Sequence, residues 1–406
     1  MEPLIYGKKV RRTSMLGALI RRERLKQNFS QEGLCRGICV VSYLSKIEQG
    51  RVEAGEDIIR ALLKRLGISY EADPEFLDKA GNLMEELYEK LYNDMLKEED
   101  LEEIQKDQQR YLSSVYMLDV LLFQQISLEE KKVSSCEKTE DGKMEELREY
   151  VPCMTERQYE LYLYVVHRFG EGEQESLEKL LKLNPNGFYL TQAGVWYWAK
   201  GEYSRAVELL TRGYTAASEE GTVRNMMLAK LMLGNCYSST NNQELMMKNY
   251  MIAKRIAQAV GEKEWIQDIY YNIASTFLEW DQMEAAEAYF QKCTRRDTLY
   301  YHKYAICKER LGKKQEALLL LKQGREHEEF RKVSVYQEMY DVVEYRLRHE
   351  HYQKEEAYEK LLRTCMKHMR KELPKSYEKY HVPWLIEILE HQRKYKEICE
   401  LMKEFS

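Results

Sequence analysis

Residues able to bond to nucleic acid occur at helical spacing near the amino end of the chain, in the segment from Val41 to Gln49. Its apolar Leu44 and Ile47 lie three positions apart, which predicts a helix with these side chains facing inward. Ser42 and Lys46 supply a hydroxyl and an ammonium group four positions apart. Such groups can donate hydrogen bonds to base edges in the major groove, and an ammonium can also pair with phosphate. These two groups are compatible with contact to nucleic acid.

A set of short helices is expected to position this segment. Between Met15 and Ser69 the apolar residues follow helical spacing and are interrupted by turn residues, which predicts four or five short helices in about 55 residues. Ser30 is placed to cap the second helix, and Gly37 breaks it before the next one begins. Gly50 and Gly67 end two later helices.

Two strings of this region, LGALIRRERLKQNFSQEGL and VSYLSKIEQG, resemble the repressor-like helix-turn-helix domain of the Xre or Cro type. The resemblance implies that the second string lies in the major groove and that the start of the second helix meets phosphate. The implied DNA-binding residues are Val41, Ser42 and Lys46 toward the bases, Tyr43 and Ser45 nearer the DNA backbone, and Gln31 and Arg51 toward phosphates.

The head departs from the common pattern of this family in two places. One residue fewer than usual separates Gln31 from Ser42, so Gly37 must form the turn. Val40 stands where Ser or Thr usually caps the helix, and the missing acceptor is expected to cost about 1 kcal/mol. Val40 and Val41 can contact thymine methyl groups but cannot donate hydrogen bonds, so modest specificity from each half-site is expected. The alternative is a helix-turn-helix that binds protein, with both valines in the interface.

Charge is distributed unevenly along the 406 residues. The first 70 residues carry 14 Lys and Arg against 7 Asp and Glu, a net charge of +7; because the whole chain carries −5, the remainder carries −12. A basic head on an acidic body indicates that only the head meets nucleic acid. No apolar run approaches the ~18 residues of a membrane span, and the amino end lacks an apolar signal core. The nine cysteines follow no pairing pattern, which favours a reducing cytoplasm.

Catalytic, metal and cofactor sites are not expected. Cys35 and Cys39 lack zinc-ligand spacing and a partner His, and His349 and His351 fall on different helical faces. The sequence contains no glycine-rich phosphate loop, nucleophile elbow or HExxH string. We therefore expect a protein that is not an enzyme and that needs no cofactor.

The remainder of the chain divides into a connector and an array. We assign residues 11–70 to the head, 71–145 to a helical connector and 146–406 to the array. The connector has a helical pattern from Glu75 to about Leu128, and a polar loop is expected over Val133 to Lys143.

The array consists of helix pairs joined by tight turns. Their second helices align at steps of 40, 40 and 31 residues, on Ala206, Met246, Ala286 and Ala317. Periods of this length predict a helical solenoid, which makes the whole chain all-α.

The units resemble tetratricopeptide repeats. The first helices carry a Leu-Gly-like pair with an aromatic residue further along, so that the small residues allow close helix packing and the aromatic rings fill the gap between pairs. The matching positions are Ala193-Gly194 with Tyr197, Leu233-Gly234 with Tyr237, and Ile273-Ala274 with Phe277. This resemblance implies a right-handed solenoid.

The head and the array together resemble the RRNPP group of peptide-sensing regulators, through the GICVVSYLSKIE string, the repeats and the overall length. The resemblance implies a cytoplasmic transcription factor of quorum sensing that forms a homodimer and binds an inverted-repeat operator. It also implies that a short linear signalling peptide binds in the concave groove of the repeats and shifts the affinity for DNA.

Residues of the first helices are expected to line that groove. A carboxamide can bond both the N–H and the C=O of an extended peptide, which draws attention to two asparagines, while aromatic side chains offer apolar pockets. The expected peptide-binding residues are Thr191, Trp198, Leu231, Asn235, Tyr271, Asn272 and His302.

Two other functions fit the same sequence. The chain could be an interaction protein whose groove grips another protein, or a DNA-binding regulator whose repeats serve only oligomerisation. The sequence does not determine the operator, the peptide, the dimer interface, or whether the protein activates or represses.

Overall fold

The computed structural model describes residues 12–52, 54–69, 71, 73–135, 147–169, 173–294, 296–373, 377–378 and 381–405. All regular elements within these ranges are helices, which confirms the all-α class. The chain forms two compact units, Met1–Tyr189 and Leu190–Ser406. The three-part division into residues 11–70, 71–145 and 146–406 stays a prediction.

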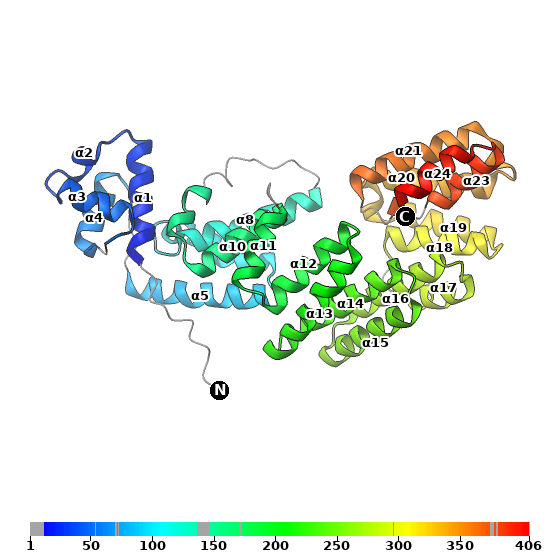
Figure 1. Cartoon of the computed structure of the whole chain (residues 1–406), viewed down its shortest axis with the longest axis horizontal. Coiled ribbons are helices and arrows are strands. Elements are labelled where there is room, and N and C mark those ends of the chain that lie inside the picture. Colours follow the sequence, from blue (N-terminus) through cyan, green and yellow to red (C-terminus); the bar gives the residue numbers. More distant parts are fainter. Residues whose placement is uncertain are drawn as a thin grey trace. The chain divides into compact units, whose positions relative to one another are not determined.

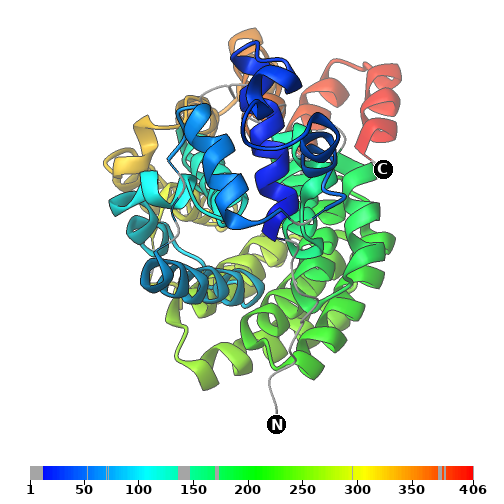
Figure 2. The same cartoon turned by 90° about the vertical axis from the view of Figure 1, so that its left-hand side faces the viewer.

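The head consists of four helices. They are α1 (Arg12–Lys26), α2 (Gln31–Cys35), α3 (Val41–Glu48) and α4 (Glu56–Arg65), shown in dark blue in Figure 1 and nearest the viewer in Figure 2. The Ser30 hydroxyl accepts a hydrogen bond from the Gly33 N–H at 2.9 Å, which confirms the expected cap of α2. Gly37 has a φ of +74°, so the turn before α3 uses the left-handed conformation that glycine allows.

Close packing of α1 on α3 holds the head together. A methyl group in place of the Gly17 hydrogen would lie 2.0 Å from the Ile47 carbonyl oxygen, so only glycine permits this approach. The core beneath the helices is apolar and fully buried at Ile20, Leu34, Leu44, Ile47, Leu62 and Leu63. Leu44 and Ile47 are the two residues that the spacing of the third helix predicted to face inward.

The connector is less regular than the sequence suggested. It comprises α5 (Pro74–Tyr92), η1 (Glu98–Leu101), α6 (Glu102–Lys106), α7 (Gln108–Leu112) and α8 (Met117–Ser135). The second helical stretch is therefore broken into short pieces before α8, and Asp94 turns the chain at a φ of +55°. The start of the loop predicted over Val133 to Lys143 is wrong, because residues Val133 to Ser135 belong to α8. The rest of the predicted loop lies outside the described residues.

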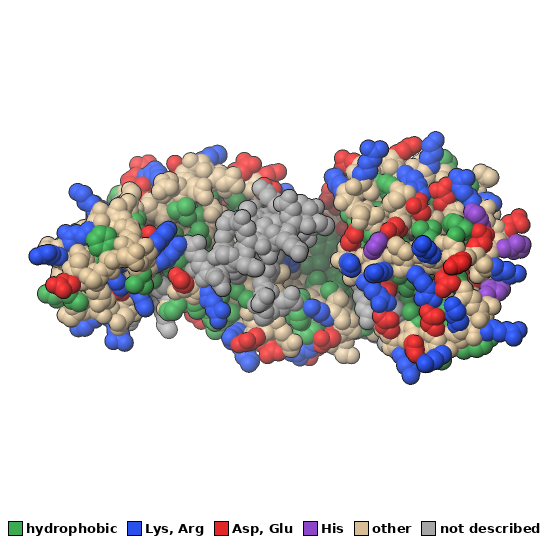
Figure 3. All heavy atoms as spheres, turned by 90° about the horizontal axis from the view of Figure 1, so that it is seen from above, with side chains coloured by type: hydrophobic (Ala, Val, Ile, Leu, Met, Phe, Trp, Pro, Cys, Tyr) green, Lys and Arg blue, Asp and Glu red, His purple; other side chains and the backbone are tan. Residues whose placement is uncertain are grey.

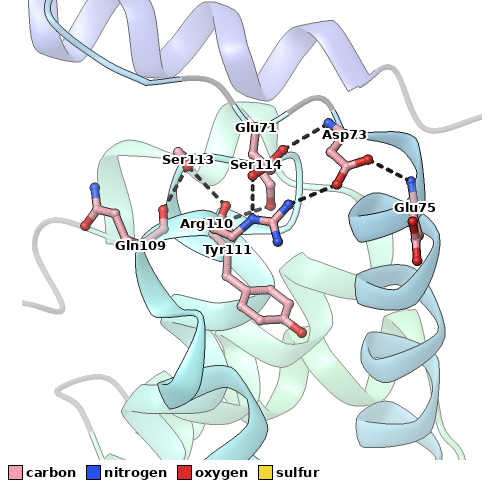
Figure 4. A network of polar contacts seen from close by, with 8 residues as sticks. All are labelled: Glu71, Asp73, Glu75, Gln109, Arg110, Tyr111, Ser113 and Ser114. Carbon is pink, nitrogen blue, oxygen red and sulfur yellow. Dashed lines mark hydrogen bonds and ion pairs between the residues drawn. The ribbon is translucent and has the colours of Figure 1, made fainter.

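An arginine on α7 pins the segment between the head and α5 (Figure 4). The Arg110 guanidinium donates to Glu71 at 2.6 Å and to Asp73 at 3.1 Å, and lies 4.0 Å from the centre of the Phe76 ring. The Glu71 N–H donates to the Ser113 carbonyl oxygen at 2.9 Å. These bonds join Glu71 and Asp73, at the exit from the head, to the connector.

The core of the head also extends into the connector. Met117 and Leu118 of α8 and Tyr150 belong to the same buried cluster as Ile20. Tyr150 precedes η2 (Val151–Cys153), and its hydroxyl accepts a hydrogen bond from Arg22 of α1. The head thus shares a hydrophobic core with the connector.

Helix pairs with tight turns make up the remainder. In the first unit they begin with α10 (Glu156–Phe169) and α11 (Glu173–Leu183). The following pairs, from green to red in Figure 1, are α12 (Gly187–Ala199), α13 (Tyr203–Glu220), α14 (Val223–Ser239), α15 (Gln243–Val260), α16 (Lys263–Glu279), α17 (Met283–Phe290), α18 (Thr298–Arg310), α19 (Lys314–Arg325), η3 (Glu328–Arg331), α20 (Val335–Arg348), η4 (Tyr352–Lys354), α21 (Glu356–Glu372), α23 (Val382–His391) and α24 (Tyr395–Phe405).

The repeat pattern has a direct packing cause. The four aligned positions of the second helices, Ala206, Met246, Ala286 and Ala317, are all fully buried. A Cβ atom at Gly234 would lie 2.4 Å from the Tyr250 ring, so α14 and α15 approach as closely as the small-residue pattern predicted. Of the described helices, none is long and apolar enough to cross a bilayer.

Candidate functional site

The outer face of α3 carries the residues expected to read DNA. Val40 and Val41 are 67% and 41% exposed, and Ser42 and Lys46 are exposed beside them. The two valines are therefore not buried within their own domain. Arg51 is also exposed, whereas Tyr43 and Ser45 are half-buried, with the Ser45 hydroxyl accepting a bond from the Gln49 amide at 3.1 Å. The base-reading roles of these residues stay a prediction.

The start of α3 lacks a side-chain cap, as the sequence predicted. Val40 has the extended conformation of a capping residue, with φ −83° and ψ 150°, but it cannot accept a hydrogen bond through its side chain. The first N–H groups of the helix consequently receive no side-chain acceptor from this position.

A buried ion pair orients the head beneath this face, and sequence reasoning missed it. Arg24 of α1 donates to the Glu48 carboxylate through Nε at 2.6 Å and through Nη2 at 3.0 Å. Gln31 of α2 donates to the same carboxylate at 2.8 Å, and Arg24 donates to the Phe29 carbonyl oxygen at 2.8 Å. Gln31 is thus half-buried, and the amide N–H that bonds to Glu48 is not available to phosphate.

The surface of the head agrees with its net charge. Figure 3 shows one face of the molecule, with Lys and Arg side chains prominent over the head at the left. The described basic residues that are exposed there include Arg21, Arg36, Lys46, Arg51, Arg60 and Lys64. Such a surface attracts the phosphate backbone regardless of sequence.

The second unit contains a cavity of about 140 Å³ that is lined by both polar and apolar atoms. Many of its lining residues come from α12, α14, α16 and α18, the first helices of successive pairs, which is the face that the sequence assigned to the groove. The lining residues are Trp198, Tyr203, Asn235, Ser238, Ser239, Tyr250, Tyr271, Asn272, Ser275, Thr276, Glu279, His302, Lys303, Met339, Tyr377 and His381.

Five of the seven expected groove residues are brought together in this cavity: Trp198, Asn235, Tyr271, Asn272 and His302. Thr191 is fully buried, and its hydroxyl faces Gly213 of α13. Leu231 is also buried and does not line the cavity. The position of Thr191 and Leu231 gives no support to a groove role, and peptide contact by the other five stays a prediction.

The two asparagines are bonded to each other. The Asn235 side-chain oxygen accepts hydrogen bonds from the Tyr250 hydroxyl at 2.7 Å and from the Asn272 amide at 3.2 Å. Its amide nitrogen has only the Met232 sulfur as a weak acceptor, at 3.3 Å. Asn235 therefore has a donor to offer a ligand but no spare acceptor, whereas Asn272 keeps an N–H and its oxygen. The two-ended carboxamide role fits Asn272 better.

Three basic side chains also line the cavity: His302 and His381, which are buried, and Lys303, which is half-buried. Burial lowers the pKa of Lys303, whose ammonium lies 5.1 Å from the ring centre of Tyr271 and 5.3 Å from that of Tyr377. Burial also lowers the pKa of His381 to about 4, and that of His302 well below its ordinary value. The cavity thus combines neutral imidazoles, an amide pair and aromatic rings, which is chemistry for binding a polar ligand.

Comparison with known proteins identifies both parts of the chain. A helix-turn-helix family model matches residues 20–72, and a tetratricopeptide-repeat model matches residues 267–298. The chain combines a helix-turn-helix domain with tetratricopeptide repeats. This combination is the one through which the sequence resembles the RRNPP group, and that resemblance is confirmed at the level of domain content and fold. No curated protein sequence matches the chain significantly.

Solved structures support the helical-repeat architecture. A Rap protein complexed with competence and sporulation factor is similar at a TM-score of 0.59 and 12% identity, over 81% of this chain and 96% of the Rap chain. At this identity the likeness concerns the fold alone. Aspartyl phosphate phosphatase F of Bacillus subtilis has a TM-score of 0.46 at 11% identity, over 100% of this chain and 95% of its own. PlcR of Bacillus thuringiensis, in complex with the peptide PapR7 and DNA, has 0.31 at 14% identity, over 76% and 99%. The last two scores are too low to support an argument.

Several residues of the repeat-domain cavity were not expected from the sequence. Tyr203 and Tyr250 belong to second helices, and Met339, Tyr377 and His381 lie beyond the four strongest repeats. A register based on the first helices of the four strongest repeats cannot find them, because they belong to second helices or to later parts of the chain. Among the described residues there is no cluster of His, Cys, Asp and Glu suited to a metal ion.

Proposed function

We propose that this chain is a cytoplasmic transcriptional regulator that binds an inverted-repeat operator through α3 and a short linear signalling peptide through the repeat cavity. The homodimer couples the two sites, so that peptide binding changes the affinity for DNA, as in quorum sensing. The observation that carries the proposal is that one chain holds both an exposed α3 face on a basic head and a cavity in the repeat domain lined by polar and apolar atoms.

The DNA half of the proposal rests on the head. The family match covers the helix-turn-helix, Ser42 and Lys46 are exposed, and the basic residues supply a sequence-independent attraction to phosphate. The valines beside them favour apolar contact with thymine methyl groups.

The peptide half rests on the cavity. Asn272 retains both a donor and an acceptor, which are the groups that an extended backbone requires. The Rap protein that shares the repeat fold was solved with competence and sporulation factor, which supports a ligand-binding role for such an array. We propose no catalytic role for this chain.

The runner-up functions are a scaffold whose groove holds another protein and a regulator whose repeats only oligomerise. Unpaired polar atoms of cavity-lining residues, such as the Ser275 hydroxyl, favour a ligand that inserts hydrogen-bonding groups over the flat surface of another protein.

Selection of genomic DNA fragments by purified protein tests the DNA half. It is run beside a Ser42→Ala/Lys46→Ala variant at two salt concentrations. Wild type should enrich discrete inverted-repeat sites that the variant does not enrich. Equal binding by both proteins, abolished by salt, would show that the head is not a specific reader and would favour the scaffold.

A further inference from the structure

Three buried polar atoms of the cavity-lining residues have no hydrogen-bond partner among the described residues. They are Nε1 of Trp198, the hydroxyl of Ser275 and Nδ1 of His302, which come from α12, α16 and α18. An unpaired buried polar atom costs about 1–3 kcal/mol, so each of them is an unusual feature of a folded interior. All three side chains belong to the face that lines the cavity.

The bonding of His302 determines what its free nitrogen can do. Nε2 lies 3.3 Å from the Met339 carbonyl oxygen, and because a carbonyl oxygen can only accept, Nε2 must carry the hydrogen. Burial, followed by the charges of His381 and Lys303, lowers the pKa of the ring, which is therefore neutral. In a neutral imidazole with its hydrogen on Nε2, Nδ1 is an acceptor. Nδ1 of His302 is thus an unsatisfied hydrogen-bond acceptor and not a donor.

Neighbouring rings hold this imidazole in place. The His381 ring is stacked on it with centres 5.9 Å apart and an angle of 18° between the planes. His381 is fixed in turn by its Nδ1, 3.1 Å from the Tyr377 carbonyl oxygen, and Tyr340 packs 5.6 Å from the His302 ring. With only 1% of its surface exposed, His302 is an acceptor of fixed direction.

We propose that His302 is a specificity-determining residue of the ligand site, whose Nδ1 accepts a hydrogen bond from an uncharged N–H or O–H of the bound peptide. The donor is a backbone amide or a neutral polar side chain. A carboxylate has no hydrogen to donate, and the Lys303 ammonium next along α18 opposes a cationic donor. The Ser275 hydroxyl, one repeat earlier on α16, is another unsatisfied group among the cavity-lining residues. This inference rests on the proposed peptide-binding function.

The substitution that isolates this acceptor is His302→Gln. The glutamine amide can occupy the position of Nε2 and donate to the Met339 carbonyl oxygen, while the acceptor at Nδ1 is lost. His391→Gln makes the same chemical change at an exposed histidine of α23 and serves as the control. Thermal unfolding of each variant shows whether the fold is retained.

The probe is a pool of synthetic random heptapeptides, captured by the full-length protein and identified by mass spectrometry. The most enriched peptide is then synthesised, and its affinity for each variant is measured by calorimetry. His302→Gln should lower this affinity about 10-fold, while His391→Gln leaves it unchanged. Removing donor hydrogens from the peptide one at a time, by N-methylation or side-chain replacement, should identify one position whose loss weakens wild type about 10-fold but does not weaken His302→Gln further.

Each other result overturns the inference. Equal affinity of wild type and His302→Gln, or the absence of a coupled peptide position, shows that Nδ1 does not meet the ligand, although the cavity still binds peptide. A lower melting temperature with unchanged affinity assigns His302 to the fold alone. If wild type enriches no peptide relative to Asn272→Ala, the proposed peptide-binding function itself fails, and the inference fails with it.

Discussion

Replacing Arg24 by Met should destabilise the head far more than the loss of an ordinary surface arginine. The Arg24 and Glu48 side chains are 9% and 3% exposed, and the pair is held by two hydrogen bonds of 2.6 and 3.0 Å. Without the guanidinium, the buried carboxylate keeps only the Gln31 amide, and the expected loss is about 3–5 kcal/mol. For a domain of this size, such a loss lowers the melting temperature by roughly 12 °C or more.

The double variant Arg24→Met/Glu48→Leu makes the test specific. It removes both charges together and fills the space with apolar groups, so its stability should return to within about 1 kcal/mol of wild type. Arg60→Met is the matched control, because Arg60 pairs with Glu56 at 2.6 Å on the surface, with side chains 55% and 61% exposed. That exposed pair should contribute less than about 1 kcal/mol.

Hydrogen exchange of the head amides in the full-length protein is the suitable assay, since it reports the unfolding free energy of the head separately from that of the repeats. Genomic-fragment binding by the same variants should follow head stability, with the double variant partly restored. If Arg24→Met costs no more than Arg60→Met, or if the double variant is as unstable as Arg24→Met alone, the desolvated ion pair does not hold the head together and the reasoning is wrong.

Three further outcomes are expected. In gel-shift titrations, replacing thymine by uracil in a selected operator should weaken DNA binding by wild type by up to ~0.8 kcal/mol per contacted methyl, but should not weaken DNA binding by a Val40→Ser/Val41→Ser variant. Equal losses of affinity in both proteins would contradict thymine contact. Gly234→Ala should cost about 1–3 kcal/mol in urea unfolding, because the added methyl lies 2.4 Å from the Tyr250 ring, and an unchanged midpoint would disprove the close approach. The pKa of His381 is lowered to about 4 in the folded protein, so the unfolded chain binds a proton first as the pH falls below about 6.5, and the stability of the repeats should decrease toward pH 4 by up to ~3 kcal/mol. In urea unfolding at a series of pH values, the stability of His381→Gln should depend less on pH than that of wild type, and identical profiles would refute the assignment.

The residues that line the cavity were predicted from the sequence only in part. The register of the first helices predicted Trp198, Asn235, Tyr271, Asn272 and His302 as groove residues, and the cavity is lined by all five. The same register included Thr191, which instead packs against Gly213 of α13. Periodicity assigns a side chain to a face of its helix, but how deeply that side chain is buried depends on the neighbouring helix.

The sequence by itself determined the helices of the head and of the repeats, their glycine turns, the uncapped start of α3, the small buried residues of the repeats, and the basic head on an acidic body. These properties depend on spacing and composition within a few turns of chain, so they can be read locally. Only the tertiary structure decided which polar atoms are satisfied. The Glu48 carboxylate meets Arg24, the Asn235 oxygen is taken by Tyr250 and Asn272, and His302 is bonded to Met339. Hydrogen bonding is short-ranged and directional, so partners distant in the sequence become known only when the helices are packed together.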